Sequence, residues 1–333
     1  MVRSRFLPPP LRAALFCALA AAAMPAPAED LNTQLVDTLT KLAGGPHAGY
    51  RANHAKGQML TGTFTPAASA KTLSKASYLN GGPVKLLARF SDGTGVPTIP
   101  DADPHAKPNG LALRFQLDGG AFADMVCIST NGFPASTPEN FLAFLQAVAA
   151  SGPDAAKPTP IEKFLAEHPE SVRFVQLPKP APVGFGTQTY YGVNAFKFTN
   201  AEGKEQYGRY RITPLGGEKF LSEAEAKAAT PDYLYEGLQK QLPATPVEFR
   251  ITVQLAAAGD KLDDGTAVWP DDRPQVELGT VRLDALVADS KAEEKKLMFS
   301  PLNLVDGIAP SADPVLLARP GAYAVSFGRR VGK

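Results

Sequence analysis

The chain has 333 residues, of which 44% are hydrophobic, so it can bury a large core in one large domain or two average ones. Lysine and arginine total 34 against 33 aspartate and glutamate, and the net charge is +1. Because there is no basic surplus, we expect no nucleic-acid partner.

The first 28 residues have the features of a secretory signal peptide. Arginines precede an apolar run at 13–23, and Ala26-Pro27-Ala28 is typical of a cleavage site. The run is about half as long as a membrane-spanning helix, so we expect cleavage near Ala28 and no stable membrane insertion. The arginines are not adjacent, which favours the general secretory route and a periplasmic mature protein. Cleavage also removes Cys17 and leaves Cys127, which we interpret as a buried core residue.

The mature sequence predicts strands interrupted by helices. Apolar residues three or four positions apart mark the helices, and β-branched and aromatic runs between Gly, Pro and Asn mark the strands. In chain order, the first half predicts a helix at 29–42, strands at 60–64, 84–90, 111–117 and 122–129, and a helix at 138–150. The second half predicts strands at 194–199 and 207–213, a helix at 223–242, strands at 247–255 and 275–283, and helices at 291–298 and 319–329.

This order of elements indicates an α+β fold with a single domain over residues 29–333. About eight strands bury their edges most simply by closing into an antiparallel β-barrel, with the helices around it. Composition and periodicity go no further than this, so the function has to be inferred from local motifs.

The most distinctive motif is Arg51-Ala52-Asn53-His54-Ala55-Lys56-Gly57, which leads into a predicted strand. A histidine taken alone is more often a structural hydrogen-bonding residue than a catalyst. Here an arginine stands three residues before the histidine, and His-Ala-x-Gly follows it, which makes the pattern specific. The block resembles the distal-histidine segment of haem catalases.

Further segments extend this resemblance over most of the chain from residue 50 to residue 332. Ala88-Arg89-Phe90-Ser91 and Gly110-Leu111-Ala112-Leu113-Arg114-Phe115 are similar to neighbouring segments of catalases. The run Arg319-Pro320-Gly321-Ala322-Tyr323, with Arg330 seven residues later, is similar to the C-terminal Arg-x-x-x-Tyr block of the family. The resemblance to the catalase superfamily implies a catalase-like barrel that holds haem b.

The resemblance also implies roles for the matching residues. His54 would be the distal histidine that moves the protons of peroxide, and Ser91 would hold its ring by a hydrogen bond. Tyr323 would be the iron ligand. Its phenol binds metal well only when ionised, and ferric iron together with the cation of Arg319 favours the phenolate. The alternatives are a turn serine at Ser91 and a core tyrosine beside a surface arginine.

The remaining haem contacts of the family are matched only in part. The matching propionate-binding arginines and haem-side aromatic residues are Arg51, Phe133, Phe141 and Arg330. A third family arginine is missing, and Ala106 stands at its position. His105 and Lys107 flank this alanine, and either is a candidate to replace the arginine.

The chain departs from catalases in a second respect. Catalases place an asparagine beside the distal histidine, whereas the corresponding position here is Ile128. Ser129 or Asn131 would reach the site only if the strand bulged. Without this amide a second peroxide is not oriented as reductant, and the chain is too short for the threading arm of full catalases. Both features favour the catalase-related peroxidases, a smaller bacterial group.

We therefore expect a haem peroxidase that reduces hydrogen peroxide or organic hydroperoxides with small organic electron donors, and that has weak or no catalase activity. Two alternatives remain open. One is a fatty-acid hydroperoxide-transforming haem enzyme similar to allene oxide synthases, and the other is a non-catalytic haem-binding protein. A homodimer is compatible with the sequence.

Overall fold

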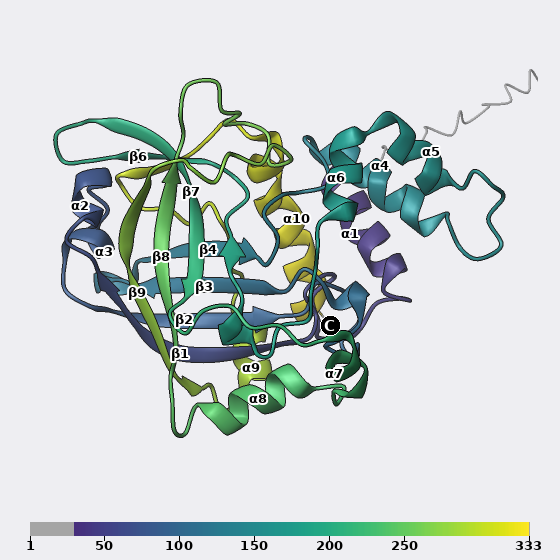
Figure 1. The fold of residues 1–333 in the computed structure, drawn as a ribbon, viewed down its shortest axis with the longest axis horizontal. Helices are drawn as coiled ribbons and strands as arrows, with labels where there is room; N and C mark the ends of the chain where they lie inside the picture. Colours follow the sequence, from purple (N-terminus) through teal and green to yellow (C-terminus); the bar gives the residue numbers. More distant parts are fainter. Residues whose placement is uncertain (1–29, 333) are drawn as a thin grey trace, which may run out of the picture.

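A computed structural model describes residues 30–332, in which ten strands form one antiparallel sheet (Figure 1). Eight of them close into a barrel through the pairing of β7 with β8. In order around the barrel they are β1 (Gly57–Pro66), β2 (Val84–Ser91), β3 (Gly110–Gln116), β4 (Phe122–Ile128), β5 (Tyr190–Tyr191), β7 (Glu205–Pro214), β8 (Val247–Leu255) and β9 (Gln275–Leu286). The short strands β6 (Phe196–Thr199) and β10 (Ile308–Pro310) extend the sheet from β7. The predicted α+β barrel is confirmed, and the predicted signal peptide lies outside the described residues.

The barrel interior is filled by side chains that alternate along the strands. In β8, for example, Val247, Phe249, Ile251 and Val253 are buried, whereas the side chains between the first three of them are exposed. This alternation with period two places one set of residues in the core and the other on the outer face. The barrel is therefore a packed core, and its outer face is available for a site.

Helices cover one part of this outer face. Helix α10 (Pro314–Val331) packs against α1 (Leu31–Leu42) and α4 (Pro138–Ala149), which also pack against each other (Figure 1). The other helices are α2 (Ala70–Leu73), α3 (Ser77–Asn80), α5 (Pro160–Glu167), α6 (Pro169–Gln176), α7 (Glu223–Ala228), α8 (Tyr233–Gln241) and α9 (Ser290–Lys296). No helix within residues 30–332 combines the length and the apolar character that crossing a membrane requires.

The structure corrects the predicted helix at 223–242. It consists of two helices, because α7 ends at Ala228 and α8 begins at Tyr233. Pro231 lies between them. Proline lacks the N–H that a continuous helix needs and restricts the residue before it to extended conformations.

The last helix also differs from its prediction at 319–329, because it begins at Pro314 and contains Pro320. The carboxylate of Asp313 accepts hydrogen bonds from the backbone N–H groups of Val315 and Leu316. An aspartate cap followed by proline is a typical helix start, and this signal places the true beginning. Helices α2, α3, α5 and α6 and strands β5 and β10 were not predicted. Of these, α2, α3, β5 and β10 have only two to four residues, which is too short for a clear period.

Candidate active site

A cavity of about 260 Å³ lies between the barrel and helices α1, α4 and α10. The walls are mostly apolar, and the polar groups are concentrated in three places. All of the site residues predicted from the sequence line it, namely Arg51, His54, Ser91, Phe133, Phe141, Arg319, Tyr323 and Arg330. The structure therefore brings together residues that lie up to 279 positions apart in the chain.

The floor of the cavity is the outer face of β2, β3 and β4. Ser91 pairs with Gly110, which pairs in turn with Ile128 on the next strand. Two residues back along β2, Arg89 pairs with Ala112. Because residues two apart on a strand share a face, Arg89 and Ser91 both point into the cavity.

His54 stands over this floor, just before β1. Its Nδ1 lies 3.1 Å from the Ser91 hydroxyl oxygen, and its backbone has a positive φ of 54°. That conformation is uncommon for a residue with a side chain and is found where surrounding structure holds it. A Cβ atom at Gly110 would lie 2.9 Å from the same Nδ1, so the close approach of ring and strand requires glycine there.

The environment of His54 keeps its imidazole neutral. Burial, reinforced by the positive charges of Arg89 and Arg319, lowers the pKa of the ring to about 3. The ring is therefore uncharged near pH 7. With Nδ1 facing Ser91, Nε2 remains as the nitrogen that can take up a proton.

One end of the cavity carries a cluster of three arginines. Glu294 of α9 accepts hydrogen bonds from Arg51 Nη1 and Arg89 Nε, both at 2.7 Å. Arg330 donates to the carbonyl oxygen of Leu297 at 3.0 Å. Its buried Nε has no hydrogen-bond partner among the described residues. Two of the three guanidinium groups thus share one carboxylate, and the third has no carboxylate partner among the described residues.

The electrostatics of this cluster favour an anionic ligand. Burial and repulsion from Arg89 lower the pKa of Arg330 to about 10, and burial with repulsion from Arg89 and Arg330 lowers the pKa of Arg51. Guanidinium groups pair with carboxylates in a fork geometry. The excess positive charge and the unpartnered Nε therefore fit a ligand that presents carboxylates at one edge, as the propionates of haem do.

Arg89 was not predicted as a site residue, although the sequence contains the signal. Ser91 was expected to face His54, and strand alternation places Arg89 on the same side. His105 and Lys107, the candidates to replace the missing arginine, are not among the described residues that line the cavity. His105 is exposed and pairs with Asp103, and Lys107 donates a hydrogen bond to Asn109. The third cation at this end of the cavity is therefore Arg89.

The opposite wall is formed by α10. Arg319 donates two hydrogen bonds to the phenol oxygen of Tyr323, from Nε at 3.0 Å and from Nη2 at 2.8 Å. The third nitrogen of Arg319 donates to Asn194 Oδ1 at 2.8 Å, and Asn194 Nδ2 donates to Asp313 Oδ2 at 2.8 Å. Arg319 therefore holds the phenol oxygen of Tyr323 in a fixed position at the cavity wall.

Asn194 is a second residue that sequence reasoning missed in this role. It lies in the Tyr191–Phe198 segment, remote in sequence from α10, and no local pattern indicates that it reaches Arg319. Asp313 is better placed for prediction, because it is the helix cap of α10. One carboxylate therefore fixes both the start of the helix and the amide that holds Arg319.

Apolar side chains complete the cavity. The ring centres of Phe133 and Phe141 lie 4.8 Å apart, and the angle between the ring planes is 50°. Ile128, the last residue of β4, lines the cavity. Ser129 and Asn131, in the loop that follows, are not among the described residues that line it. The Ser129 hydroxyl instead accepts a hydrogen bond from the Asn109 backbone at 3.0 Å. The strand does not bulge to bring a polar group next to His54.

Comparisons with known proteins agree with this geometry. A family model described as Catalase matches residues 32–333. A catalase-related peroxidase of Synechococcus elongatus is 35% identical over 86% of this chain and 85% of its own length. A catalase-related peroxidase of Mycolicibacterium paratuberculosis is 33% identical over 90% of this chain and 94% of its own length.

This chain also matches part of a longer relative. A catalase of Methanosarcina barkeri is 29% identical over 90% of this chain but over only 62% of its own length. The family match, the closed barrel, and the histidine and tyrosine on opposite walls of one cavity all support the same assignment. The chain belongs to the catalase family of oxidoreductases that act on peroxide.

Proposed function

We propose that the chain is a haem-dependent peroxidase that reduces hydrogen peroxide or organic hydroperoxides with small organic electron donors. The observation that carries this proposal is the cavity with neutral His54 on one wall and the Arg319–Tyr323 pair on the other. The names of two relatives, 35% and 33% identical to this chain, support it as well.

The residues that would hold the cofactor fit haem b. Tyr323 would be the iron ligand, and the arginine cluster of Arg51, Arg89 and Arg330 would bind the propionates. Phe133 and Phe141 would pack against the macrocycle. When bound, the haem iron accepts oxidising equivalents from peroxide and passes them to the donor.

The side chains would carry out the proton steps. His54 Nε2 would take the proton from the attacking oxygen of peroxide and deliver it to the leaving oxygen, which departs as water. Ser91 would keep the ring in the orientation that this transfer requires. Arg319 would hold the oxygen of Tyr323 in place, because two of its N–H groups point at it.

Weak catalase activity is proposed from Ile128. This side chain lies across the strand pair from Gly110, against which the His54 ring packs. An isoleucine offers neither a donor nor an acceptor to a second peroxide, so peroxide would serve poorly as its own reductant. Organic donors would then supply the electrons.

Parallel assays of guaiacol oxidation and oxygen release test this proposal. The haem-loaded protein should oxidise guaiacol with hydrogen peroxide and release little oxygen, and Ile128→Asn should increase oxygen release. Rapid oxygen release by the unmodified protein would contradict the assignment. Consumption of a fatty-acid hydroperoxide without any donor would favour an allene oxide synthase-like enzyme, and a haem spectrum without turnover would indicate a haem-binding protein.

Export to the periplasm is proposed from residues 1–28 of the sequence alone. Mass spectrometry of the periplasmic fraction should find a mature chain that begins near Glu29. A chain that keeps Met1 and stays in the cytoplasm would contradict export. The single domain over 29–333 and a homodimer remain predictions, which limited proteolysis and light scattering would check.

A further inference from the structure

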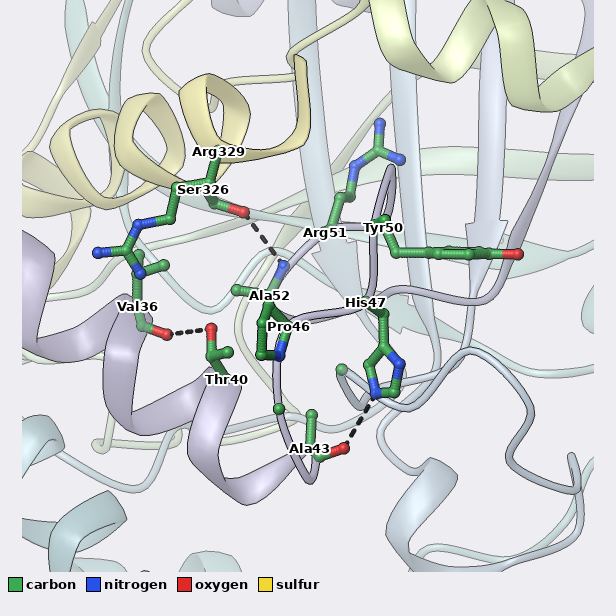
Figure 2. Close-up of a pocket in the computed structure, with 13 residues that line it drawn as sticks. Val36, Thr40, Ala43, Pro46, His47, Tyr50, Arg51, Ala52, Ser326 and Arg329 are labelled. Carbon is green, nitrogen blue, oxygen red and sulfur yellow. Dashed lines mark hydrogen bonds between the residues drawn. The ribbon is translucent and has the colours of Figure 1, made fainter. Parts of the chain in front are cut away.

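A second, smaller pocket of about 110 Å³ lies beside the large cavity, between α1, residues 43–52 and α10 (Figure 2). We call it the side pocket. It is separate from the large cavity, but Val36, Arg51, Ala52 and Ser326 line both. We propose that the side pocket binds the organic reductant, and that its preferred ligand is a small phenol that carries a carboxylate. This inference rests on the peroxidase function proposed above.

The two spaces share a wall, because the same residues line both of them. The Ala52 backbone N–H donates to the Ser326 hydroxyl oxygen at 3.2 Å, and this bond joins residues 43–52 to α10 (Figure 2). Arg51 adjoins the same wall, and its guanidinium group belongs to the arginine cluster. A donor in the side pocket would therefore sit next to the edge of the haem that carries the propionates. Electrons can cross such a wall, although peroxide and donor never meet.

The size and the walls of the side pocket suit an aromatic ring. Val36, Ala43, Pro46 and Ala52 supply an apolar surface around it (Figure 2). An apolar cavity of about 150 Å³ holds a benzene molecule, and the side pocket is about a quarter smaller but partly open to solvent. It would therefore enclose part of a single aromatic ring and leave the substituents at the mouth.

The charges at the mouth favour a negative substituent. Arg329 lines the side pocket and pairs with Asp37. Lys291 lies over the ring of Tyr50, another residue of the lining, at 5.4 Å from the ring centre. Among the described residues that make these contacts, cations exceed carboxylates. A carboxylate on the ligand would balance this excess.

His47 supplies a polar group for the phenol itself. Its Nε2 lies 3.0 Å from the Ala43 carbonyl oxygen, which requires the proton to be on Nε2 (Figure 2). Nδ1 is then an acceptor for the phenol hydroxyl. Each phenol would give up one electron through the wall and one proton to His47 and solvent. Two phenols thereby reduce one hydrogen peroxide to two waters and leave as two phenoxyl radicals.

Two matched variants and two matched donors test the proposal. Thr40→Phe would fill the side pocket from α1, and Thr38→Phe is its control, because both threonines bond to the carbonyl four residues earlier but only Thr40 lines the side pocket. Ala48→Phe fills it from an exposed position within residues 43–52. Vanillate and guaiacol are the donors, since they share a methoxyphenol ring and differ in the carboxylate.

Calorimetric titration of the haem-loaded protein with vanillate, without peroxide, gives a readout that is independent of activity. Vanillate should bind the unmodified protein and Thr38→Phe more tightly than guaiacol does, and both filling variants should lose about tenfold in affinity. In turnover, the filling variants should lose a similar factor in kcat/KM for vanillate, while the KM for hydrogen peroxide stays unchanged.

Vanillate binding that is equal in all four proteins would overturn the assignment of the side pocket, and so would an unchanged kcat/KM in both filling variants. Failure of the peroxidase proposal would look different. Binding lost in the filling variants, with no donor oxidised by the unmodified protein, would contradict the proposed function and leave the side pocket as a binding site.

Discussion

The two walls of the large cavity hold their key residues in opposite ways. On one wall, the His54 ring lies 3.1 Å from the Ser91 hydroxyl oxygen and is hydrogen-bonded to the backbone of Asp92, and burial together with nearby arginines lowers its pKa. On the other, the Tyr323 oxygen receives two N–H groups at 2.8 and 3.0 Å from Arg319. Asn194 and Asp313 fix Arg319 in turn.

This difference follows from what each group has to do. A residue that takes up and returns a proton needs a free nitrogen and a neutral resting state, so few strong partners are an advantage. A ligand oxygen has to remain anionic and in place, so a forked cation and a rigid support are an advantage. Removing groups from each wall tests this contrast.

The largest effect is expected from Tyr323→Phe. The variant removes the only group that the account assigns to the iron, so haem should be lost on desalting. Absorbance of the haem band relative to protein measures this. Tyr207→Phe, on β7 and outside the cavity lining, is the control and should keep its haem. Full retention of haem by Tyr323→Phe would show that the iron ligand has been misassigned.

His54→Ala should keep haem but react slowly with peroxide. General acid–base catalysis by a positioned side chain contributes about 10²- to 10⁴-fold, so we expect a loss in that range. Stopped-flow mixing with hydrogen peroxide measures the rate. His105→Ala, at an exposed position, should behave like the unmodified protein. A normal rate in His54→Ala would exclude the proposed proton transfer.

The lowered pKa of His54 should also be visible in the pH dependence of the protein's stability. The pKa of His54 is about 3 in the folded chain against an ordinary value of 6.5. Between these values the unfolded chain binds a proton that the folded chain does not. The free energy of unfolding should therefore fall with falling pH, by about 1.4 kcal/mol per pH unit for this group.

Urea unfolding of the haem-free protein at several pH values measures this slope. Carboxylates titrate in the same range, so the comparison is between the unmodified protein and His54→Ala. The variant should have the shallower slope between pH 6.5 and pH 4. Equal slopes would mean that His54 has an ordinary pKa.

Ser91→Ala should slow the reaction with peroxide less than His54→Ala does, and it is the smallest of the expected effects. The hydroxyl orients the ring without touching substrate, and loss of such a supporting group typically costs about 10-fold or more. The rate with peroxide should fall by about that factor, and haem content should stay constant. If Ser91→Ala were as slow as His54→Ala, the serine would take part in the proton transfer directly.

Much of this architecture could be predicted from the sequence. Alternating runs identified most of the barrel strands, and the motifs around His54 and Tyr323 placed both walls of the cavity. Asp313-Pro314 is a typical helix start, but the prediction of α10 relied on periodicity and did not use it. Pro231 likewise marked the break between α7 and α8.

What could not be predicted depends on contacts between distant segments. Glu294 meets Arg51 and Arg89 only because α9 packs against β1, and its own helix shows no distinguishing pattern. Asn194 reaches Arg319 across 125 positions. The side pocket exists only because residues 43–52 fold between α1 and α10.

The absorption spectrum of the haem-reconstituted protein tests the central claim most directly. Tyr323 as a phenolate ligand, held by Arg319, predicts a haem band of high-spin ferric iron with an oxygen ligand. This band should be lost in Tyr323→Phe and kept in His54→Ala. A protein that takes up no haem, or that shows the same spectrum in Tyr323→Phe, would contradict the account.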